Sequence, residues 1–431
     1  MCTKFTERAL HIEQLLLINN HEIDTNSLRK ACSYGIPDLL RPLCWRLFLD
    51  FLPKERHLWP KTLRKQRADY LALVENLIVL PGQKPDAFCR PAQDGMVDHP
   101  LSSNPHSEWD KFFKDNEMLL QIDRDVRRLR PEIEFFQKNT PFPLTSAAQI
   151  NLSGRITREN LPSDVVESRF VNRSFLNNND TKLPKIDSDD PSSGNETHWQ
   201  VLERILFVYS KVNSGVKYVQ GMNEIIGPIY YVFATDPDLE WAEHAEVDTF
   251  YCFQHLMSEI KDNFIRTLDD SNCGIESAMN RLHERIQSHD PELYTYLIET
   301  LGIKPQFYAF HVITLWDAIF ASKNRVELVE FVCMAMLSNV REILLAGDFG
   351  QNIRLLQNYP VMDVSKLIVL AYEIRSGEHN HSRTGSFRNM GSENGIKSWN
   401  NLNKERLTAF VSGAKERFTS YASATKKSLK K

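Results

Sequence analysis

The chain has 431 residues, of which 42% are hydrophobic and 25% are charged, as in ordinary globular proteins. Its formal net charge of -4 gives no overall attraction to nucleic acid. The N-terminus "MCTKFTERAL" is charged where a secretory signal would be apolar, and no run is long enough to cross a bilayer. We therefore expect a cytoplasmic protein that does not bind nucleic acid.

The seven cysteines are scattered along the chain, and no two of them form a C-x-x-C pair. This pattern is typical of reduced thiols and is unlike a structural zinc site. The sequence therefore predicts no metal site.

Apolar residues recur at spacings of three and four along nearly the whole chain, which predicts an all-α fold. An early example is residues 62–80, "TLRKQRADYLALVENLIVL", and later ones are residues 198–212 and 325–345. Between them, one helix face is expected to carry Trp109, Phe112, Phe113, Leu119, Ile122 and Val126.

The helix with this face continues into "QIDRDVRRLRPEI", residues 121–133. Pro131 predicts that it ends near Arg130, because a proline disfavours helical geometry in the residue before it. Arg128 would then project from a helix end, and Asp125 lies close enough in sequence to orient it. Without other information, this is an exposed helix end with a salt bridge.

The segment from about residue 145 to 198 is rich in Asn, Ser and Asp, and we predict a disordered insertion. A flexible linker is expected from Ser376. After it, residues 404–431 carry eight basic and two acidic residues and could form a basic amphipathic helix. Such a helix can lie on an anionic membrane surface, and a solvated helix with a disordered end is the alternative.

The stretch "KYVQGMNEIIGPIYYVF", residues 217–233, predicts a buried helix whose first turns hold the polar residues Tyr218, Gln220, Gly221 and Asn223. Taken alone, Gln220 is a buried amide that needs partners, because burying an unpaired amide costs about 1–3 kcal/mol.

Two short patterns occur in a fixed order: I-x-x-D-x-x-R at Ile122, Asp125 and Arg128, and Y-x-Q ending at Gln220. Together with "YGIPDLLRPLCWRLFLDFLP" from Tyr34, "PQFYAF" and "LWDAIF", they resemble the signature motifs of TBC-domain Rab GTPase-activating proteins. The resemblance covers residues 34–375 and implies a TBC fold of two helical lobes. Residues 1–33 would form an N-terminal helical extension, and residues 376–431 the linker and tail.

The resemblance implies that Arg128 is an arginine finger and that Gln220 positions the attacking water, both supplied in trans to a GTP-bound Rab. Arg127 and Arg130 are rivals in composition, but only Arg128 has the family spacing from Asp125. No cofactor is implied for this chain, because the Rab binds GTP and Mg²⁺. The chain would have no substrate turnover of its own and would act in vesicle trafficking, with peripheral contact to endomembranes or the plasma membrane.

The resemblance also assigns supporting roles. Asp125 would fix the direction of the arginine, and Tyr218 and Asn223 would shape the loop and the Rab contact. Gly221 would let the backbone approach its neighbours closely. Trp45 and Arg46 are expected to brace the N-terminal lobe rather than to touch nucleotide, and they could support the finger or contact the Rab.

One departure from the family pattern lies between Phe310 and Trp316, where about fifteen residues, or four turns of helix, are absent from "YAFHVITLWD". Both finger motifs lie upstream of this point. Three hypotheses follow: an active Rab GTPase activator, an inactive or unstable isoform that at most binds Rab, and a helical scaffold on membranes.

Overall fold

The computed structural model describes helices and turns in nine stretches of the chain, and these contain two isolated β-bridges but no strand. The all-α prediction is confirmed. The described residues are 2–18, 22–78, 108–130, 133–144, 152–156, 196–264, 274–301, 313–360 and 362–377. Most of the predicted insertion at 145–198, nearly all of the tail at 376–431, and residues 302–312 of the shortened segment lie outside them.

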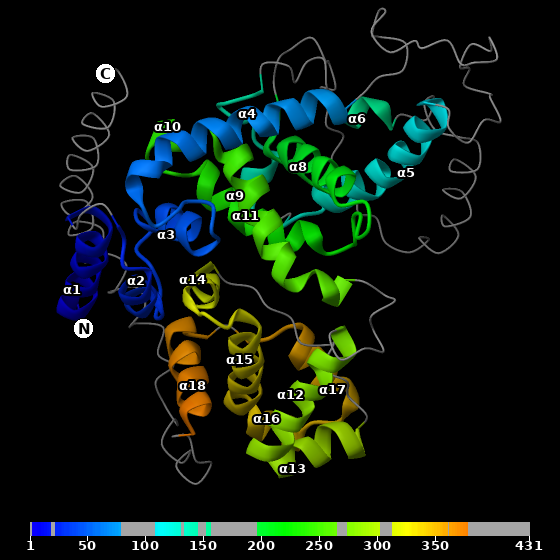
Figure 1. Ribbon diagram of the computed structural model, residues 1–431. Coiled ribbons are helices and arrows are strands. Elements are labelled where there is room, and N and C mark those ends of the chain that lie inside the picture. Colours follow the sequence, from blue (N-terminus) through cyan, green and yellow to red (C-terminus); the bar gives the residue numbers. More distant parts are fainter. Residues whose placement is uncertain are drawn as a thin grey trace, which may run out of the picture. The chain divides into compact units, whose positions relative to one another are not determined.

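The chain divides into two compact units. The first comprises Met1–Phe48, Leu52–Thr62 and Arg266–Lys431, and the second comprises Leu49–Phe51 and Leu63–Ile265. The N-terminal and C-terminal helices of the described chain therefore belong to the same unit (Figure 1).

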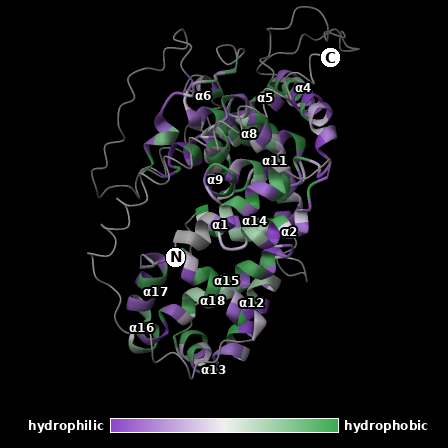
Figure 2. Cartoon of the chain, turned by 90° about the vertical axis from the view of Figure 1, so that its left-hand side faces the viewer, coloured by the Kyte–Doolittle hydropathy of each residue, from purple (hydrophilic) through white to green (hydrophobic). Residues whose placement is uncertain are grey.

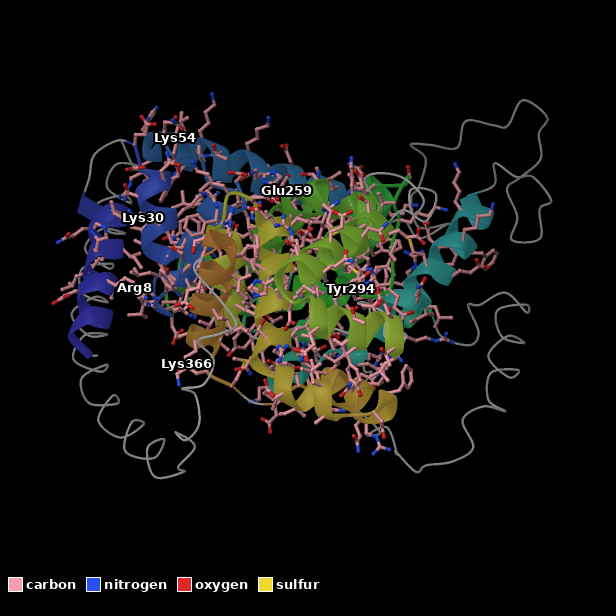
Figure 3. The ribbon with its side chains drawn as sticks, turned by 90° about the horizontal axis from the view of Figure 1, so that it is seen from below. Arg8, Lys30, Lys54, Glu259, Tyr294 and Lys366 are labelled. Carbon is pink, nitrogen blue, oxygen red and sulfur yellow. The ribbon has the colours of Figure 1, made fainter. Side chains whose placement is uncertain are left out.

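The first unit is built around α14, which packs on α2, α3 and α18, while α15 packs along α18. Its helices and helical turns are α1 (Cys2–Glu13), the turn Gln14–Ile18, α2 (Thr25–Cys32), α3 (Arg41–Phe48), the turn Arg56–Leu58, α12 (Ile275–His289), α13 (Pro291–Tyr294), the turn Thr295–Thr300, α14 (Ile313–Ala321), α15 (Arg325–Asn339), α16 (Arg341–Ala346), α17 (Phe349–Gln357) and α18 (Val364–Ser376). Lys30 on α2 and Lys366 on α18 are exposed on the surface of this unit (Figure 3).

The second unit has a core of α8, α9 and α11, against which α5 packs through α8. Its elements are most of α4 (Trp59–Leu77), α5 (Glu108–Arg127), the turn Glu134–Gln137, α6 (Leu152–Arg155), α8 (His198–Val212), α9 (Met222–Ala234), α10 (Leu239–Ala242), α11 (Ala245–Ile260) and the turn Lys261–Phe264. Figure 2 shows hydrophobic stretches on α8, α9 and α11, and more hydrophilic ones along α4. The helical periodicity predicted for this segment agrees with the burial along α4, because its buried residues Tyr70 and Val74 are four apart and lie on one helix face.

The predicted face of α5 is confirmed in its last part, where Leu119, Ile122 and Val126 are fully buried, whereas Phe112 and Phe113 are only partly buried. The expected helix at 198–212 matches α8, which begins with a reciprocal cap between Thr197 and Gln200. The expected helix at 325–345 is two helices, α15 and α16, with a break at Val340.

Candidate functional site

Arg128 follows the last residue of α5 directly, and its side chain is 67% exposed. The helix therefore ends slightly earlier than predicted, but the arginine projects from its end as expected. Two hydrogen bonds hold the guanidinium: Nη2 donates to Asp125 Oδ1 at 2.7 Å, and Nε donates to the carbonyl oxygen of Arg124 at 2.9 Å. Both acceptors lie on the last turn of α5, so the exposed side chain has a defined direction.

The Asp125 side chain joins the end of α5 to the segment before α9. Its carboxylate is 7% exposed, and its Oδ2 accepts a hydrogen bond from the Tyr218 hydroxyl at 2.8 Å. The side-chain Nδ2 of Asn223, the second residue of α9, donates to the Asp125 carbonyl oxygen at 3.1 Å. Burial, followed by hydrogen bonding to Asp125, raises the pKa of Tyr218, so the hydroxyl stays protonated and remains a donor.

The helix predicted for residues 217–233 begins only at Met222, and its first part is a turn. Lys217 has a φ of 58° and Gly221 has a φ of 102°, and both values belong to the left-handed region. A Cβ at Gly221 would meet no atom within 4 Å, so this glycine is needed for its positive φ and not for a close approach. The expectation of a close approach at this position was wrong.

Gln220 lies in this turn and is exposed, so the interpretation of it as a buried amide was wrong. Its side chain makes no hydrogen bond within the described chain. The residues on both sides of the turn are held instead, Tyr218 and Asn223 by Asp125 and the Gly221 carbonyl by the Glu224 amide at 3.1 Å. The structure thus presents an exposed arginine and an exposed amide on two segments that one buried carboxylate connects.

Arg127 and Arg130, the other two candidates for the finger, bind other acidic residues of the chain. Arg127 donates to Asp123 at 2.7 Å, and its guanidinium lies over the Trp199 ring at 4.1 Å from the centroid. Arg130 forms an ion pair with Glu224, with 3.3 Å between Nε and Oε2, and its side chain is only 25% exposed.

Three residues near the site were missed by the motif patterns: Leu129, Glu224 and Gly227. Leu129 is fully buried, and a Cβ at Gly227 would come within 2.9 Å of its Cδ2. A glycine inside an apolar helix is a sequence signal for such a close approach. The role of Glu224 has no comparable signal, because its partner Arg130 lies almost a hundred residues earlier in the sequence, after the end of α5.

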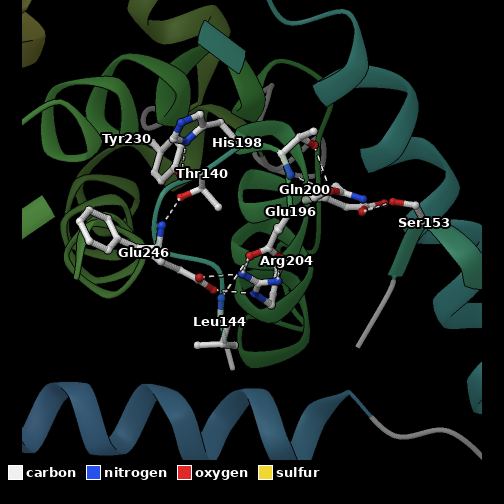
Figure 4. Close-up of polar contacts among 12 residues, drawn as sticks. Thr140, Leu144, Ser153, Glu196, His198, Gln200, Arg204, Tyr230 and Glu246 are labelled. Carbon is white, nitrogen blue, oxygen red and sulfur yellow. Dashed lines mark hydrogen bonds and ion pairs between the residues drawn. The ribbon is translucent and has the colours of Figure 1, made fainter. Parts of the chain in front are cut away.

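In the same unit, buried charged side chains connect α8 to α11 and to the segment before α8 (Figure 4). Arg204 is 2% exposed and donates to both oxygens of Glu246 at 2.7 Å and to Glu196. Nearby on α8, burial and then the charge of Asp123 raise the pKa of Glu203 to about 8. This carboxyl accepts a hydrogen bond from the Ser153 hydroxyl at 3.0 Å. Such buried networks support a defined arrangement of the helices.

Trp45 and Arg46 lie in the first unit, on α3, and are almost fully buried, with 0% and 1% exposure. Trp45 Nε1 donates to Asp317 Oδ1 at 2.8 Å, and Arg41 Nε donates to the same oxygen at 2.9 Å. Trp45 therefore ties α3 to α14, which agrees with a bracing role.

Within the described stretches, no group of three His, Cys, Asp or Glu residues could hold a metal ion. No described helix is long and apolar enough to cross a membrane.

Comparison with known proteins assigns the family. TBC1 domain family member 13 of Homo sapiens is 43% identical to this chain over 387 residues, which cover 84% of this chain and 96% of that protein. The chain belongs to the TBC domain family. The corresponding Mus musculus protein gives the same identity and coverage.

The family profile of the Rab-GTPase-TBC domain matches residues 180–345 of this TBC protein. The matched segment contains Gln220 and begins after Arg128. A solved structure, that of the Ypt/Rab-GAP domain of Gyp1p, resembles the chain with a TM-score of 0.58 and 20% identity, covering 87% of this chain and 99% of that one. At this identity the likeness shows the fold.

Proposed function

We propose that this TBC protein activates GTP hydrolysis by a GTP-bound Rab-family GTPase, with Arg128 as the arginine finger and Gln220 as the residue that orients the attacking water. The observation that carries the proposal is the shared support of the two segments: Asp125 binds Arg128 directly and binds Tyr218, two residues before Gln220. Membership of the family and the exposure of both side chains support it.

The chemistry follows from charge. Negative charge on the phosphoryl oxygens increases toward the transition state of GTP hydrolysis, and a guanidinium placed there stabilises it. An arginine supplied in trans is worth about 10³–10⁵ in rate, or about 4–7 kcal/mol. Because Asp125 orients Arg128 before docking, less rotational freedom is lost when the GTPase binds.

The remaining parts of the reaction belong to the partner. GTP and Mg²⁺ would be bound by the Rab, so this chain needs no cofactor and turns over no substrate of its own. Such an activity shortens the GTP-bound lifetime of a Rab, which is the basis for a proposed role in vesicle trafficking in the cytoplasm.

The test is single-turnover GTP hydrolysis by a panel of Rab proteins at saturating concentrations of this chain. Arg128→Ala should reduce the activated rate by about 10³-fold or more, and Gln220→Ala should also reduce it strongly. Arg124→Ala is the matched control, since this exposed arginine lies on the same helix and offers Arg128 only its backbone carbonyl. Unchanged activation by both test variants would show that the finger assignment is wrong.

The shortened segment before Trp316 is tested in the same assay. If the unchanged chain is inactive while a chain with about fifteen residues restored there is active and melts cooperatively, the inactive-isoform hypothesis is correct. Peripheral membrane contact through residues 404–431 is a separate proposal. Equal binding to anionic vesicles with and without those residues would reject it.

A further inference from the structure

The turn that carries Arg128 is fixed to one end of α9 by three different contacts. Asn223 binds the Asp125 carbonyl, Gly227 makes room for Leu129, and Glu224 pairs with Arg130. The first contact precedes Arg128 in the chain, and the other two follow it. Only the Arg130–Glu224 pair is made by side chains that reach the solvent, with exposures of 25% and 45%.

We propose that Arg130 and Glu224 are a positioning pair, which sets the rate of activation by holding the Arg128 turn at a fixed place on α9. This inference rests on the proposed function of Arg128. Neither residue would touch the GTPase's phosphates.

The backbone at Arg130 and at Glu224 explains why their ion pair would control the position of the turn that carries Arg128. Arg130 has a φ of 45°, in the left-handed region, and its carbonyl accepts a hydrogen bond from the Ile133 amide at 2.8 Å. The backbone therefore leaves helical geometry at Arg130, two residues after Arg128. A non-glycine residue leaves this conformation readily unless its surroundings hold it, and the ion pair to Glu224 supplies such a restraint.

On the other side, Glu224 is in the first turn of α9, and its amide donates to the Gly221 carbonyl, next to Gln220. The ion pair therefore joins Arg130, at the end of the turn that carries Arg128, to Glu224, which follows the turn that carries Gln220. Exposed ion pairs contribute little to global stability, so removal of this pair should leave the fold intact while the two turns move more independently.

The experiment combines a double-mutant cycle with a charge exchange, using the full chain. Arg130→Ala and Glu224→Ala should each lower kcat of the activated GTPase reaction by about threefold to tenfold, because only a fraction of molecules then holds Arg128 in the competent position. KM and the melting temperature should stay nearly unchanged. The double alanine variant should be no slower than either single variant, and Arg130→Glu combined with Glu224→Arg should recover most of the rate.

A second readout needs no GTPase. Amide hydrogen exchange at Ile133 should be faster in both single variants and should slow again in the charge-exchange variant, since the Ile133 amide is bonded to the Arg130 carbonyl.

Additive rate losses, or a charge-exchange variant as slow as the single variants, would overturn the proposal. An Arg130→Ala rate as low as that of Arg128→Ala, with no effect of Glu224→Ala, would overturn it too, because Arg130 would then be the finger. If the unchanged chain activates no Rab, the proposed function fails and a rate-setting role fails with it. Unchanged exchange at Ile133 in both single variants would show that the pair does not hold the turn.

Discussion

The hydroxyl of Tyr218 is the most direct test of the shared support of Arg128 and Gln220. In Tyr218→Phe, Asp125 Oδ2 loses the donor that lies 2.8 Å away, while the carboxylate stays 7% exposed. A hydrogen bond to a buried charged group contributes about 1.5–3 kcal/mol. For a unit of this size, the loss corresponds to a fall in melting temperature of about 3–12 °C.

The effect on catalysis should be smaller than that of removing the finger. In Tyr218→Phe, Arg128 can still donate to Asp125 Oδ1 at 2.7 Å, but the carboxylate loses the donor to its other oxygen and the turn with Gln220 loses one anchor. A fall in kcat of about threefold to tenfold is expected, since each tenfold step corresponds to about 1.4 kcal/mol. The assay is single-turnover GTP hydrolysis at saturating concentrations, with thermal unfolding measured on the same samples.

Tyr209→Phe is the matched control. Tyr209 lies on α8 in the same unit, is 2% exposed, and packs against Phe253 with 4.9 Å between ring centroids. Its hydroxyl binds no carboxylate within the described residues, so the substitution should leave kcat unchanged. If Tyr218→Phe is as stable and as active as Tyr209→Phe, Asp125 does not connect the two segments and the reasoning is refuted.

Three further predictions concern other parts of the molecule. Gly221→Ala should destabilise the chain by about 1–2 kcal/mol because of its φ of 102°, whereas Gly215→Ala, with open space around the new Cβ, should be tolerated in the same denaturant titration. The pKa of Glu203 is raised to about 8, so the free energy of unfolding should fall from about pH 4.5 to 8, because in this range only the unfolded chain loses this proton. Glu203→Gln should flatten the pH profile of the melting temperature. A profile of the variant that runs parallel to that of the unchanged chain would contradict this. Trp45→Phe removes a donor to buried Asp317 and should lower the free energy of unfolding by about 1–3 kcal/mol, without a matching loss of GTPase activation at temperatures where the chain is folded.

The sequence predicted which faces of the helices are buried better than it predicted where the helices begin. The last part of the α5 face is an example: Leu119, Ile122 and Val126 are fully buried, because a periodicity of three and four reports one side of a helix whatever packs on it. The start of α9 was misplaced, since an apolar run cannot show that Gly221 has a positive φ. The glycine was the available signal, and it was assigned a different physical role.

The contacts that build the site were not predictable from local patterns. Tyr218 and Asp125 are 93 residues apart, and the pairing of Glu224 with Arg130 depends on how α9 packs beside the end of α5. Periodicity identifies a buried face, but it does not identify the element that covers that face. The family resemblance selected Arg128 among three neighbouring arginines. The structure adds a physical difference in exposure. All three arginines pair with an acidic residue, but the side chains of Arg127 and Arg130 are 31% and 25% exposed, against 67% for Arg128.

The two proposed finger residues are prepared for docking to different degrees. Arg128 has two hydrogen bonds to α5 and keeps 67% of its side chain exposed, so part of its rotational freedom is already lost before a GTPase binds. Gln220 has a held backbone turn and an unrestrained side chain within the described chain, so its rotamer must be fixed by the partner and the attacking water. Because a long polar side chain loses about 1.5–2 kcal/mol of rotamer freedom when it is fixed, the contribution of Gln220 should depend more on which Rab is bound than the contribution of Arg128. The ratio of the two alanine effects across a Rab panel should therefore vary mainly through Gln220→Ala.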